Sequence, residues 1–521
     1  MRVFLLLLFV VFCFAHQEGI SEWAGKECSK LSPRQWKGRS DRSNWGNGVF
    51  RGVKDQCIVG AGAAGMSMAA FLKDEGQDVV VIEKEPDVGG YCDTVYFTPP
   101  APGLPNFLDI GVGIFPNSTS ANASGYGSWL LDTVAFADKY ARIWTNGSGF
   151  VFPLTTVFAQ NRLIDFQHGV DYGFQPQGVP PPEYLAAYAR FLIEVSKYPW
   201  LNTGEIPAQI PAELKVSFNE FVRVNQLEPL MPGLFFSLVF IGGFVDLDNT
   251  PAMSVLFNLP PSILDLFTRN NTIFIIIGGC YQIYNGIANY IGQENVLTST
   301  EITSVKRPRG NSRDPIRIRV KKNNRMQDIY CRKLVIAHPP DLKSLKYLDL
   351  SRDEKNVFED LRVLLYYAAA FEANGGSIAA GPAQITNFNP FNQYNWPNVP
   401  CVTSALRSFP FGPFGIFGVA KDPISNDDML DVMQAQINNV PRTLLNNTQI
   451  TTWRPHEKFC PYFTISRLLE NSNPYVALER LQGDQDTFWI GAARNAPNSG
   501  ALWDQSYKDV KYRLRSKLLC R

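Results

Sequence analysis

Three glycines at dinucleotide-binding spacing are the clearest chemical signal in the chain. Gly60, Gly62 and Gly65 stand in "CIVGAGAAGMSMAAFL", between an apolar run and an Ala- and Met-rich segment. The first permits a tight turn, the second lets the backbone approach a pyrophosphate, and the third allows a helix to pack closely. NH groups and the positive dipole at the start of that helix favour phosphates. Glu83 ends the next apolar run, where its carboxylate is placed to accept hydrogen bonds from ribose hydroxyls.

A second glycine pair favours a flavin over a nicotinamide. Gly89 and Gly90 follow in "EKEPDVGGYCDT" and let the chain pass close to a pyrophosphate and flavin, which an NAD-binding turn does not require. Further on, "FLDIGVGIF" supplies Asp109 and a small-residue turn suited to lie against a flat ring system. In this part of the chain we expect the cofactor to contact Gly60, Gly62, Ala63, Ala64, Gly65, Glu83, Lys84, Gly89, Gly90, Tyr91, Gly111, Val112 and Gly113.

The pattern around these glycines predicts the elements that position them. "QCIVGAG" indicates a strand, "AAGMSMAAFLKDEG" a helix that ends at Gly76, and "DVVVIEK" a second buried strand. Strand-like runs return much later, at "NVLTSTEITSVKR", "PIRIRVKK", "KLVIAHPP" and "DTFWIGAAR". A basic amphipathic segment, "DQSYKDVKYRLRSKLL", follows and is expected to form a solvated surface helix. We therefore predict an α/β dinucleotide-binding domain that is discontinuous in sequence.

The intervening regions predict a second domain that forms a cavity for substrate. They are rich in Pro and aromatic residues, with apolar stretches such as "LMPGLFFSLVFIGGFV" and "FPFGPFGIFG". We assign residues 55–115, 270–345 and 455–521 to the dinucleotide-binding domain, and 116–269 and 346–454 to the substrate domain. The first apolar stretch is interrupted by Pro and Gly, so we expect it to line the core or the cavity and not to cross a membrane.

The N-terminus indicates export. Residues 1–15, "MRVFLLLLFVVFCFA", read as a cleaved secretory signal, and 16–54 as an N-terminal extension. Five glycosylation sequons, at Asn117, Asn122, Asn146, Asn270 and Asn446, agree with a secreted glycoprotein. Eight cysteines remain after the signal, an even number compatible with disulfides, and we expect Cys57 to be a buried free thiol. A net charge of +1 gives no reason to expect a nucleic-acid partner.

With these motifs the chain resembles the flavin-containing amine oxidase superfamily, which includes monoamine oxidases, polyene desaturases and fatty-acid double-bond isomerases. The resemblance is carried by residues 55–115, by "IIIGGCYQIYNGIANYIG" with "TEITSVKR", by "LVIAHPP" and by "ERLQGDQDTFWIGAAR". It implies FAD as cofactor, and a discontinuous FAD-binding Rossmann-like domain of the amine-oxidase and glutathione-reductase type with an α+β substrate domain. It also implies that Ile302 contacts the adenine side through its backbone and that the turn at Gly491 and Ala492 lies near the flavin.

Three departures from the family pattern bear on cofactor and reaction. Many members carry Arg after the glycine pair, where this chain has Tyr91, so phosphate charge must be met by backbone NH groups or another cation. Many relatives place Glu or Asp after the glycine of the C-terminal turn, where this chain has Ala492 and Ala493. Amine oxidases commonly use a Lys that reaches the flavin N5 through a water. The matching strand here, "VLLYYAAAFEAN", has none, which puts efficient oxidase turnover in doubt.

The remaining polar residues single out no catalytic group. We interpret His338 as structural and His168 and His456 as isolated, and no Cys/His spacing predicts a metal site. Cys92 is expected to be a packed thiol or a disulfide partner. We expect a secreted FAD-dependent oxidoreductase that moves a hydride from an activated C–H bond of an amine or an apolar or amphipathic small molecule to flavin N5. A redox-neutral isomerase of polyunsaturated fatty acids and a secreted flavoprotein without turnover are the alternatives. The oligomeric state is left open.

Overall fold

The computed structural model describes residues 52–514 with internal gaps. The signal segment, the extension up to residue 51, four of the five sequons, Cys28 and Cys520 lie outside the described residues. The gaps are 102–105, 114, 117–132, 144–148, 154–160, 176–179, 262–263, 265–271, 309–311, 313, 377–382, 408–410 and 471.

The first sheet carries the predicted dinucleotide-binding motif. Its strands run in the order β10-β2-β1-β13-β12-β11, with β19 also paired to β13. The pairs β10–β2, β2–β1, β1–β13 and β13–β19 are parallel, whereas β11, β12 and the first half of β13 form an antiparallel meander. Cys57, Val80 and Leu334 are fully buried in the parallel part, as expected of a sheet covered on both faces. The strands are β1 (Lys54–Val59), β2 (Val79–Ile82), β10 (Val296–Leu297), β11 (Glu301–Lys306), β12 (Ile316–Lys322), β13 (Arg325–Ile336) and β19 (Thr487–Trp489).

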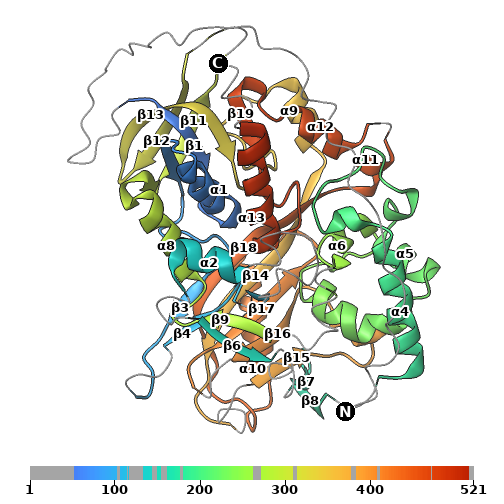
Figure 1. The fold of residues 1–521 in the computed structure, drawn as a ribbon. Helices are drawn as coiled ribbons and strands as arrows, with labels where there is room; N and C mark the ends of the chain where they lie inside the picture. The colour runs from blue at the N-terminus through green and yellow to red at the C-terminus, as the bar shows by residue number, and fades with distance from the viewer. Residues whose placement is uncertain are drawn as a thin grey trace.

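Four helices gather beside this sheet (Figure 1). They are α1 (Ala63–Asp74), α2 (Thr133–Ala141), α8 (Tyr281–Ile291) and α13 (Ser499–Lys508), which continues as the π-helix η9 (Asp509–Leu514). The helix predicted as solvated, residues 504–519, is only partly exposed: residues 504–506, Asp509, Val510 and Leu514 are buried, and residues 515–519 lie outside the described residues. The Ser506 hydroxyl donates to the Ala64 carbonyl of α1 at 3.1 Å. The basic residues that follow pair with acidic groups of the fold, for example Lys511 with Glu75.

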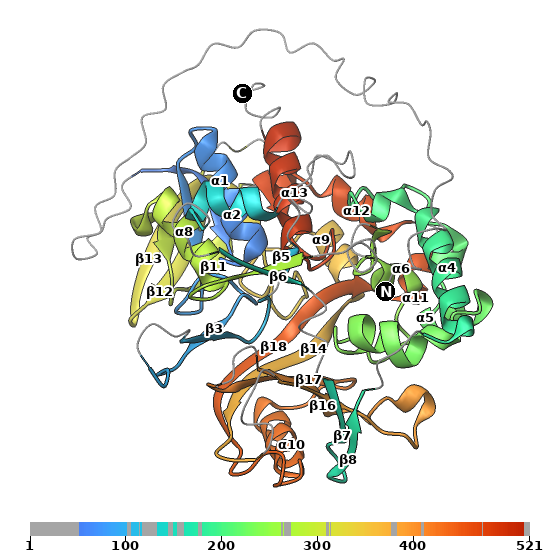
Figure 2. The ribbon, with the colours of Figure 1, turned by 60° about the horizontal axis from the view of Figure 1, so that its bottom comes forward.

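The second sheet is the main sheet of the other half of the molecule. Its order is β18-β14-β17-β16-β15-β7-β8, and the helix α10 (Asn426–Asn438) lies against it (Figure 2). The strands are β7 (Asn161–Asp165), β8 (Val170–Phe174), β14 (Leu361–Glu372), β15 (Ala383–Asn387), β16 (Cys401–Arg407), β17 (Phe414–Ala420) and β18 (Gln449–Phe463). Because β18 belongs to this sheet over its whole length, the domain boundary predicted at residue 455 falls inside a strand.

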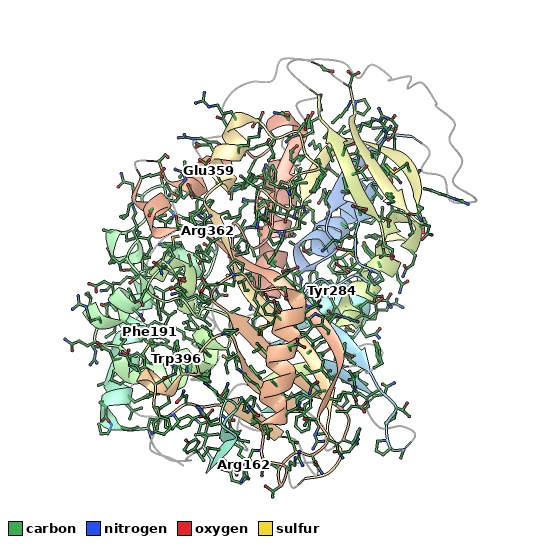
Figure 3. The ribbon with its side chains drawn as sticks, turned by 180° about the vertical axis from the view of Figure 1, so that it is seen from behind. Arg162, Phe191, Tyr284, Glu359, Arg362 and Trp396 are labelled. Carbon is green, nitrogen blue, oxygen red and sulfur yellow. The ribbon has the colours of Figure 1, made fainter. Side chains whose placement is uncertain are left out.

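A helical lobe packs against one side of the second sheet. It contains α4 (Pro182–Ser196), α5 (Phe218–Val224), the π-helix η4 (Met231–Phe240) and α6 (Ala252–Leu256). In Figure 3 Phe191 of α4 and Trp396 are labelled on one side of the molecule and Tyr284 of α8 on the other; Phe191 packs on Phe235 and Trp396 on Phe236, both of η4. The apolar stretch "LMPGLFFSLVFIGGFV" contributes η4, which buries Phe235, Phe236 and Phe240 as the sequence predicts. In the described part of the chain no helix is both long and apolar enough to cross a membrane.

Smaller elements join the two halves. The strand β6, from the predicted substrate domain, pairs with β9 from the predicted dinucleotide-binding domain, so the two are interleaved. The remaining strands are β3 (Thr94–Tyr96), β4 (Phe107–Asp109), β5 (Phe115–Pro116), β6 (Gly149–Pro153) and β9 (Thr272–Ile276). The remaining α-helices are α9 (Arg352–Phe358), α11 (Ile465–Leu469) and α12 (Pro474–Arg480). Single 3₁₀ turns are η1 (Pro199–Leu201), η2 (Ala212–Leu214), η3 (Glu228–Leu230), η5 (Gln293–Asn295), η7 (Gln393–Asn395) and η8 (Asp484–Asp486).

Candidate functional site

The first glycine loop has two positions that only glycine can occupy. Gly60 has a φ of 103°, and its NH donates to the Ile82 carbonyl at 2.9 Å, which turns the chain sharply after β1. A Cβ on Gly65 would lie 1.9 Å from the Gly60 carbonyl oxygen, so α1 can approach β1 only without a side chain there. The helix starts after Gly62 without a side-chain cap, and its first turn has no acidic residue. Its positive end is therefore left to an anion from outside the helix.

The second glycine pair lies directly against the first loop. Gly89 donates its NH to the Ala61 carbonyl at 2.8 Å, and Gly62 and Gly89 form an isolated parallel bridge. A Cβ on Gly90 would lie 3.0 Å from the Cα of Gly62, and both glycines of the pair have positive φ. The two turns form one surface made only of glycine and alanine, which we call the glycine cradle: residues 60–65 with 89–90. It fits the approach of a dinucleotide pyrophosphate, which needs bare backbone and free NH groups.

The acidic residue of the motif also organises the cradle. Glu83 is 9% exposed; its Oε2 accepts from the Ala61 NH at 2.7 Å and its Oε1 from the Glu85 NH at 2.9 Å. A carboxylate has about four acceptor positions, so Glu83 keeps capacity for ribose hydroxyls. The predicted adenine-side residue, Ile302, lies close by, because Thr300 donates its NH to the Glu83 carbonyl at 2.8 Å. Lys84 points outward: its side chain is 79% exposed and pairs with Glu85.

The C-terminal turn meets the cradle at the same edge of the sheet. Gly491 has a φ of 97°, and a Cβ there would lie 3.5 Å from the Ala337 oxygen and 3.8 Å from the Ala64 Cβ. Its NH donates to Oε1 of Gln505 at 2.9 Å, and the following Ala492 is part-exposed. The structure thus brings Gly491 to the start of α1, beside the predicted pyrophosphate contacts.

The small-residue turn expected at the ring system is held by main-chain contacts. A Cβ on Gly111 would lie 2.0 Å from the Tyr91 carbonyl oxygen, which also accepts from the Val112 NH at 2.9 Å. A Cβ on Gly113 would lie 2.6 Å from the Cβ of Asp109, so the turn depends on both glycines. The predicted cofactor residues Tyr91, Gly111, Val112 and Gly113 are therefore together, and all are part-exposed in the described structure.

Asp109 fastens this turn to the segment before α8. Its Oδ1 accepts from the Thr94 hydroxyl at 2.6 Å and from the Cys280 NH at 3.0 Å. Burial raises the pKa of Asp109 to about 6, and the hydrogen bonds from Thr94 and Cys280 only partly offset this rise. Cys92 packs against the same turn, since its thiol donates to the Val112 carbonyl at 3.4 Å. The six cysteines within the described residues, Cys57 among them, are free thiols.

Four rings gather beside Gly111, and we call them the ring cluster: Tyr91, Tyr366, His456 and Phe459. The ring centroids of Tyr91 and His456 are 4.5 Å apart, and Phe459 lies 5.3 Å from both Tyr91 and Tyr366. Tyr366 stacks on His456 with an interplanar angle of 13°. Burial raises the pKa of both Tyr91 and Tyr366 well above the usual range of tyrosine, so both phenols keep their protons.

A β-bulge in β18 builds this cluster. Tyr366 of β14 is opposite His456, and Leu364 is opposite Phe459, so three steps along β18 match two along β14. In a regular strand, residues three apart point to opposite faces. The extra residue turns His456 and Phe459 toward the same face, as bulges near active sites often do.

His456, isolated in the sequence, lies in this cluster of rings. The side chain is 6% exposed, and its Nε2 has no hydrogen-bond partner among the described residues. The nearest anion is Oδ2 of Asp93, 3.6 Å from Nε2, and a Cβ on Gly111 would lie 3.5 Å from its Cε1. Only the pairing of β14 with β18 places this residue, and no motif in the sequence marks it.

The other histidines have structural partners. The Nδ1 of His338 lies 2.9 Å from the Pro339 oxygen and its Nε2 lies 2.6 Å from the Tyr347 hydroxyl, which agrees with a structural role. His168 pairs with Asp165 in the turn between β7 and β8. Within the described residues no group of His, Cys, Asp and Glu side chains could hold a metal ion.

An apolar wall continues from the ring cluster into the helical lobe. A Cβ on Gly243 would lie 3.3 Å from the Tyr366 ring, and the same hydrophobic cluster includes Phe236, Phe240 and Trp396. The centroids of Phe240 and Trp396 are 4.8 Å apart. The sequence predicts that β14 matches the strand that carries a lysine in amine oxidases. In this chain β14 has no lysine, and it contributes Tyr366 to this region.

Comparison with known proteins agrees with this geometry. Residues 58–126 match the family model of the NAD(P)-binding Rossmann-like domain. The chain is 31% identical to an uncharacterized protein of Acanthamoeba polyphaga mimivirus, over 87% of this chain and 92% of that protein. It is 24% identical to an FAD-dependent oxidoreductase of Cochliobolus heterostrophus and 23% identical to a β-cyclopiazonate dehydrogenase of Aspergillus flavus. These matches cover 88% and 86% of this chain, and 90% of each relative.

Solved structures share the fold. One is the crystal structure of a CLA-producing fatty acid isomerase from P. acnes. It superposes with a TM-score of 0.68 at 16% identity, covering 88% of this chain and 99% of that one. Putrescine oxidase bound to putrescine gives a TM-score of 0.56 at 16% identity, with the same coverage. The glycine cradle, the mixed α/β architecture and these relatives agree on the cofactor, FAD. The chain therefore has the fold of these solved enzymes and is an FAD-dependent oxidoreductase.

Proposed function

We propose that the protein is a secreted oxidoreductase that removes a hydride from an activated C–H bond of an apolar or amphipathic small molecule. FAD, when bound, supplies the hydride acceptor at its N5. The glycine cradle would hold the pyrophosphate, Glu83 the ribose, and the turn at residues 111–113 the ring system. The ring cluster and the apolar wall would place the substrate against that ring system and keep water away from the reacting carbon.

The apolar wall beside Tyr366 is the observation on which the proposed substrate class rests. Its members Phe236, Phe240 and Trp396 are apolar aromatic residues, and none of them places a carboxylate toward Tyr366. A surface of this kind gains free energy by burying hydrocarbon, at about 25 cal/mol for each Å² removed from water. An amine with an apolar body fits the same wall, because the faces of tyrosine rings attract cations.

The absence of lysine from β14 bears on the electron acceptor. By resemblance, that lysine favours reaction with oxygen, and in this chain the position opposite His456 is Tyr366. We therefore favour an acceptor other than oxygen, which would make the enzyme a dehydrogenase. The redox-neutral alternative, isomerisation of an unsaturated fatty acid, uses the same apolar wall and returns the hydride to the substrate.

Anaerobic reduction of the flavin separates these reactions. The holoprotein is mixed under nitrogen with benzylamine, with long-chain amines and with linoleic acid, and the flavin absorbance is followed. Bleaching that persists until an artificial acceptor is added, with slow recovery in air, supports the dehydrogenase. Rapid recovery in air with peroxide would indicate an oxidase, and a conjugated diene formed without oxygen uptake would indicate an isomerase. Either of these two results would overturn the proposed reaction.

Secretion rests on the signal-like segment of residues 1–15 and on the sequons. Asn446 is the sequon within the described residues, and it is part-exposed in the segment before β18. Expression of the full chain in a secreting eukaryotic host should deliver it to the medium with a mobility that glycosidase treatment changes. Retention of the unglycosylated full-length chain in the cytosol would refute this part of the proposal.

A further inference from the structure

We propose that His456, oriented by Asp93, accepts the proton that the substrate releases when its hydride leaves. The inference rests on the proposed oxidation and names a group of this chain for a step that the cofactor does not perform. It is motivated by a buried imidazole whose Nε2 has no hydrogen-bond partner among the described residues and whose Cε1 would lie 3.5 Å from a Cβ on Gly111.

The reaction requires such a group. When a substrate H–C–X–H is oxidised, its C–H bond breaks and both electrons leave with the hydride to FAD. The X–H bond then loses a proton, and its electron pair forms the C=X bond. X is nitrogen, oxygen or a second carbon. The proton must bind to a lone pair nearby, and the imidazole of histidine is the side chain suited to accept one near neutral pH.

The other members of the ring cluster cannot accept the proton. Burial raises the pKa of the Tyr91 and Tyr366 phenols, so both keep their own protons, and Phe459 has no polar group. Asp109 also reaches the turn: its Oδ1 accepts from Thr94 and Cys280, and its Oδ2 would lie 3.2 Å from a Cβ on Gly113. Both ring nitrogens of His338 have partners. Within the ring cluster, His456 is therefore the group able to take up a proton.

The charged groups that face His456 define how it is oriented. Asp93 lies 3.6 Å from Nε2, and Arg454 lies 3.4 Å from the other oxygen of the same carboxylate. The Asp93 carboxylate therefore lies between the Arg454 guanidinium and Nε2 of His456, the ring nitrogen that faces an acceptor. Nδ1 then carries the lone pair, and the imidazolium that forms after proton transfer is paired with Asp93. From β14 the facing group is the Tyr366 phenol, and from the turn after the cradle it is the Tyr91 phenol.

The chain offers an unusually clean readout of this histidine without turnover. It contains four histidines, of which His16 lies next to the predicted signal segment and only His168, His338 and His456 lie in the described fold. Nuclear magnetic resonance of the holoprotein with labelled histidine should show one signal that disappears in His456→Gln. We expect the position of this signal to depend on pH. Asp93→Asn removes the anion nearest to the ring, so this pH dependence should differ from that of wild type.

The pH dependence of flavin reduction is the second test of this inference. With the panel compound that reduces the flavin, the rate of anaerobic reduction should fall on the acid side of its pH profile, where His456 is already protonated. His456→Gln should lose this acid limb and slow reduction by about 10²- to 10⁴-fold. In His456→Ala, added imidazole should restore part of the rate. His168→Gln, on the far turn between β7 and β8, is the matched control and should behave as wild type.

The resonance and kinetic experiments distinguish failure of this inference from failure of the proposed function. If no panel compound reduces the flavin, the proposed oxidation fails, and the resonance titration still decides whether His456 exchanges a proton under the control of Asp93. The inference is overturned if the His456 signal does not titrate or is insensitive to Asp93→Asn. It is also overturned if His456→Gln, with normal FAD content and thermal stability, keeps the acid limb and a rate within about threefold of wild type.

Discussion

Replacing Gly62 with alanine should separate cofactor binding from folding. Gly62 has φ −78° and ψ −171°, a conformation open to alanine, and the nearest atom to the added Cβ is the Gly90 Cα at 3.8 Å. Loss of backbone freedom in the unfolded chain should stabilise the variant by about 0.4–1 kcal/mol. Alanine is a poorer helix cap than glycine, which offsets this gain. The free energy of unfolding of the apoprotein should therefore stay within about 1 kcal/mol of wild type.

FAD affinity should respond very differently. The added methyl lies on the surface that a pyrophosphate must approach, and forcing a methyl into a filled contact costs about 1–3 kcal/mol. That cost corresponds to a Kd raised by about 5- to 150-fold. Urea unfolding of the apoprotein and fluorescence titration with FAD measure the two quantities. As a control, Gly76→Ala, at a φ of 74° with nothing within 4 Å, should lose some stability and bind FAD normally. Unchanged FAD affinity in Gly62→Ala, or a loss of apoprotein stability above about 2 kcal/mol, would refute the reasoning.

Three further variants test other parts of the site. Because burial raises the pKa of Asp109 to about 6 in the folded protein, against an ordinary value of 3.8, ionising it opposes folding. Wild type should therefore lose about 3 kcal/mol relative to Asp109→Asn between about pH 4 and pH 6, measured by urea unfolding; parallel pH profiles would contradict this. Tyr366→Lys should speed reoxidation of the reduced flavin by oxygen several-fold in stopped-flow, and an unchanged rate would show that β14 does not face the flavin. Arg494→Met, which removes the 2.7 Å ion pair with buried Asp509, should destabilise the fold by about 3 kcal/mol in thermal or urea unfolding; a change below about 1 kcal/mol would contradict this.

The sequence predicted the glycine cradle well because its signals are local. The close contact that requires Gly65 is with Gly60, five residues earlier, and the adjoining strands bury the β-branched residues Ile58 and Val59 of β1 and Val79–Ile82 of β2. Glu83 could be placed by its distance from the loop. Its second role, as acceptor for the NH groups of Ala61 and Glu85, depends on the closure of the turn and is not visible in the pattern.

The ring cluster could not be predicted because it depends on strand register. His456 and Phe459 come to one face only through a bulge opposite Tyr366, and a single-residue change of register would separate them. The burial of α13 was missed for a related reason: its polar residues suggest a solvent-facing helix, yet they are covered by α1 and by acidic partners distant in sequence. The strand β18 runs through residue 455, where the sequence predicted a domain boundary, because strand length is set by pairing with β14.

The most direct test of the account is the flavin content of the purified full-length protein. The account predicts one tightly held FAD in each folded chain, released as free FAD on denaturation, and rebinding of added FAD by the refolded apoprotein. A correctly folded protein that contains no flavin and does not bind added FAD would contradict it.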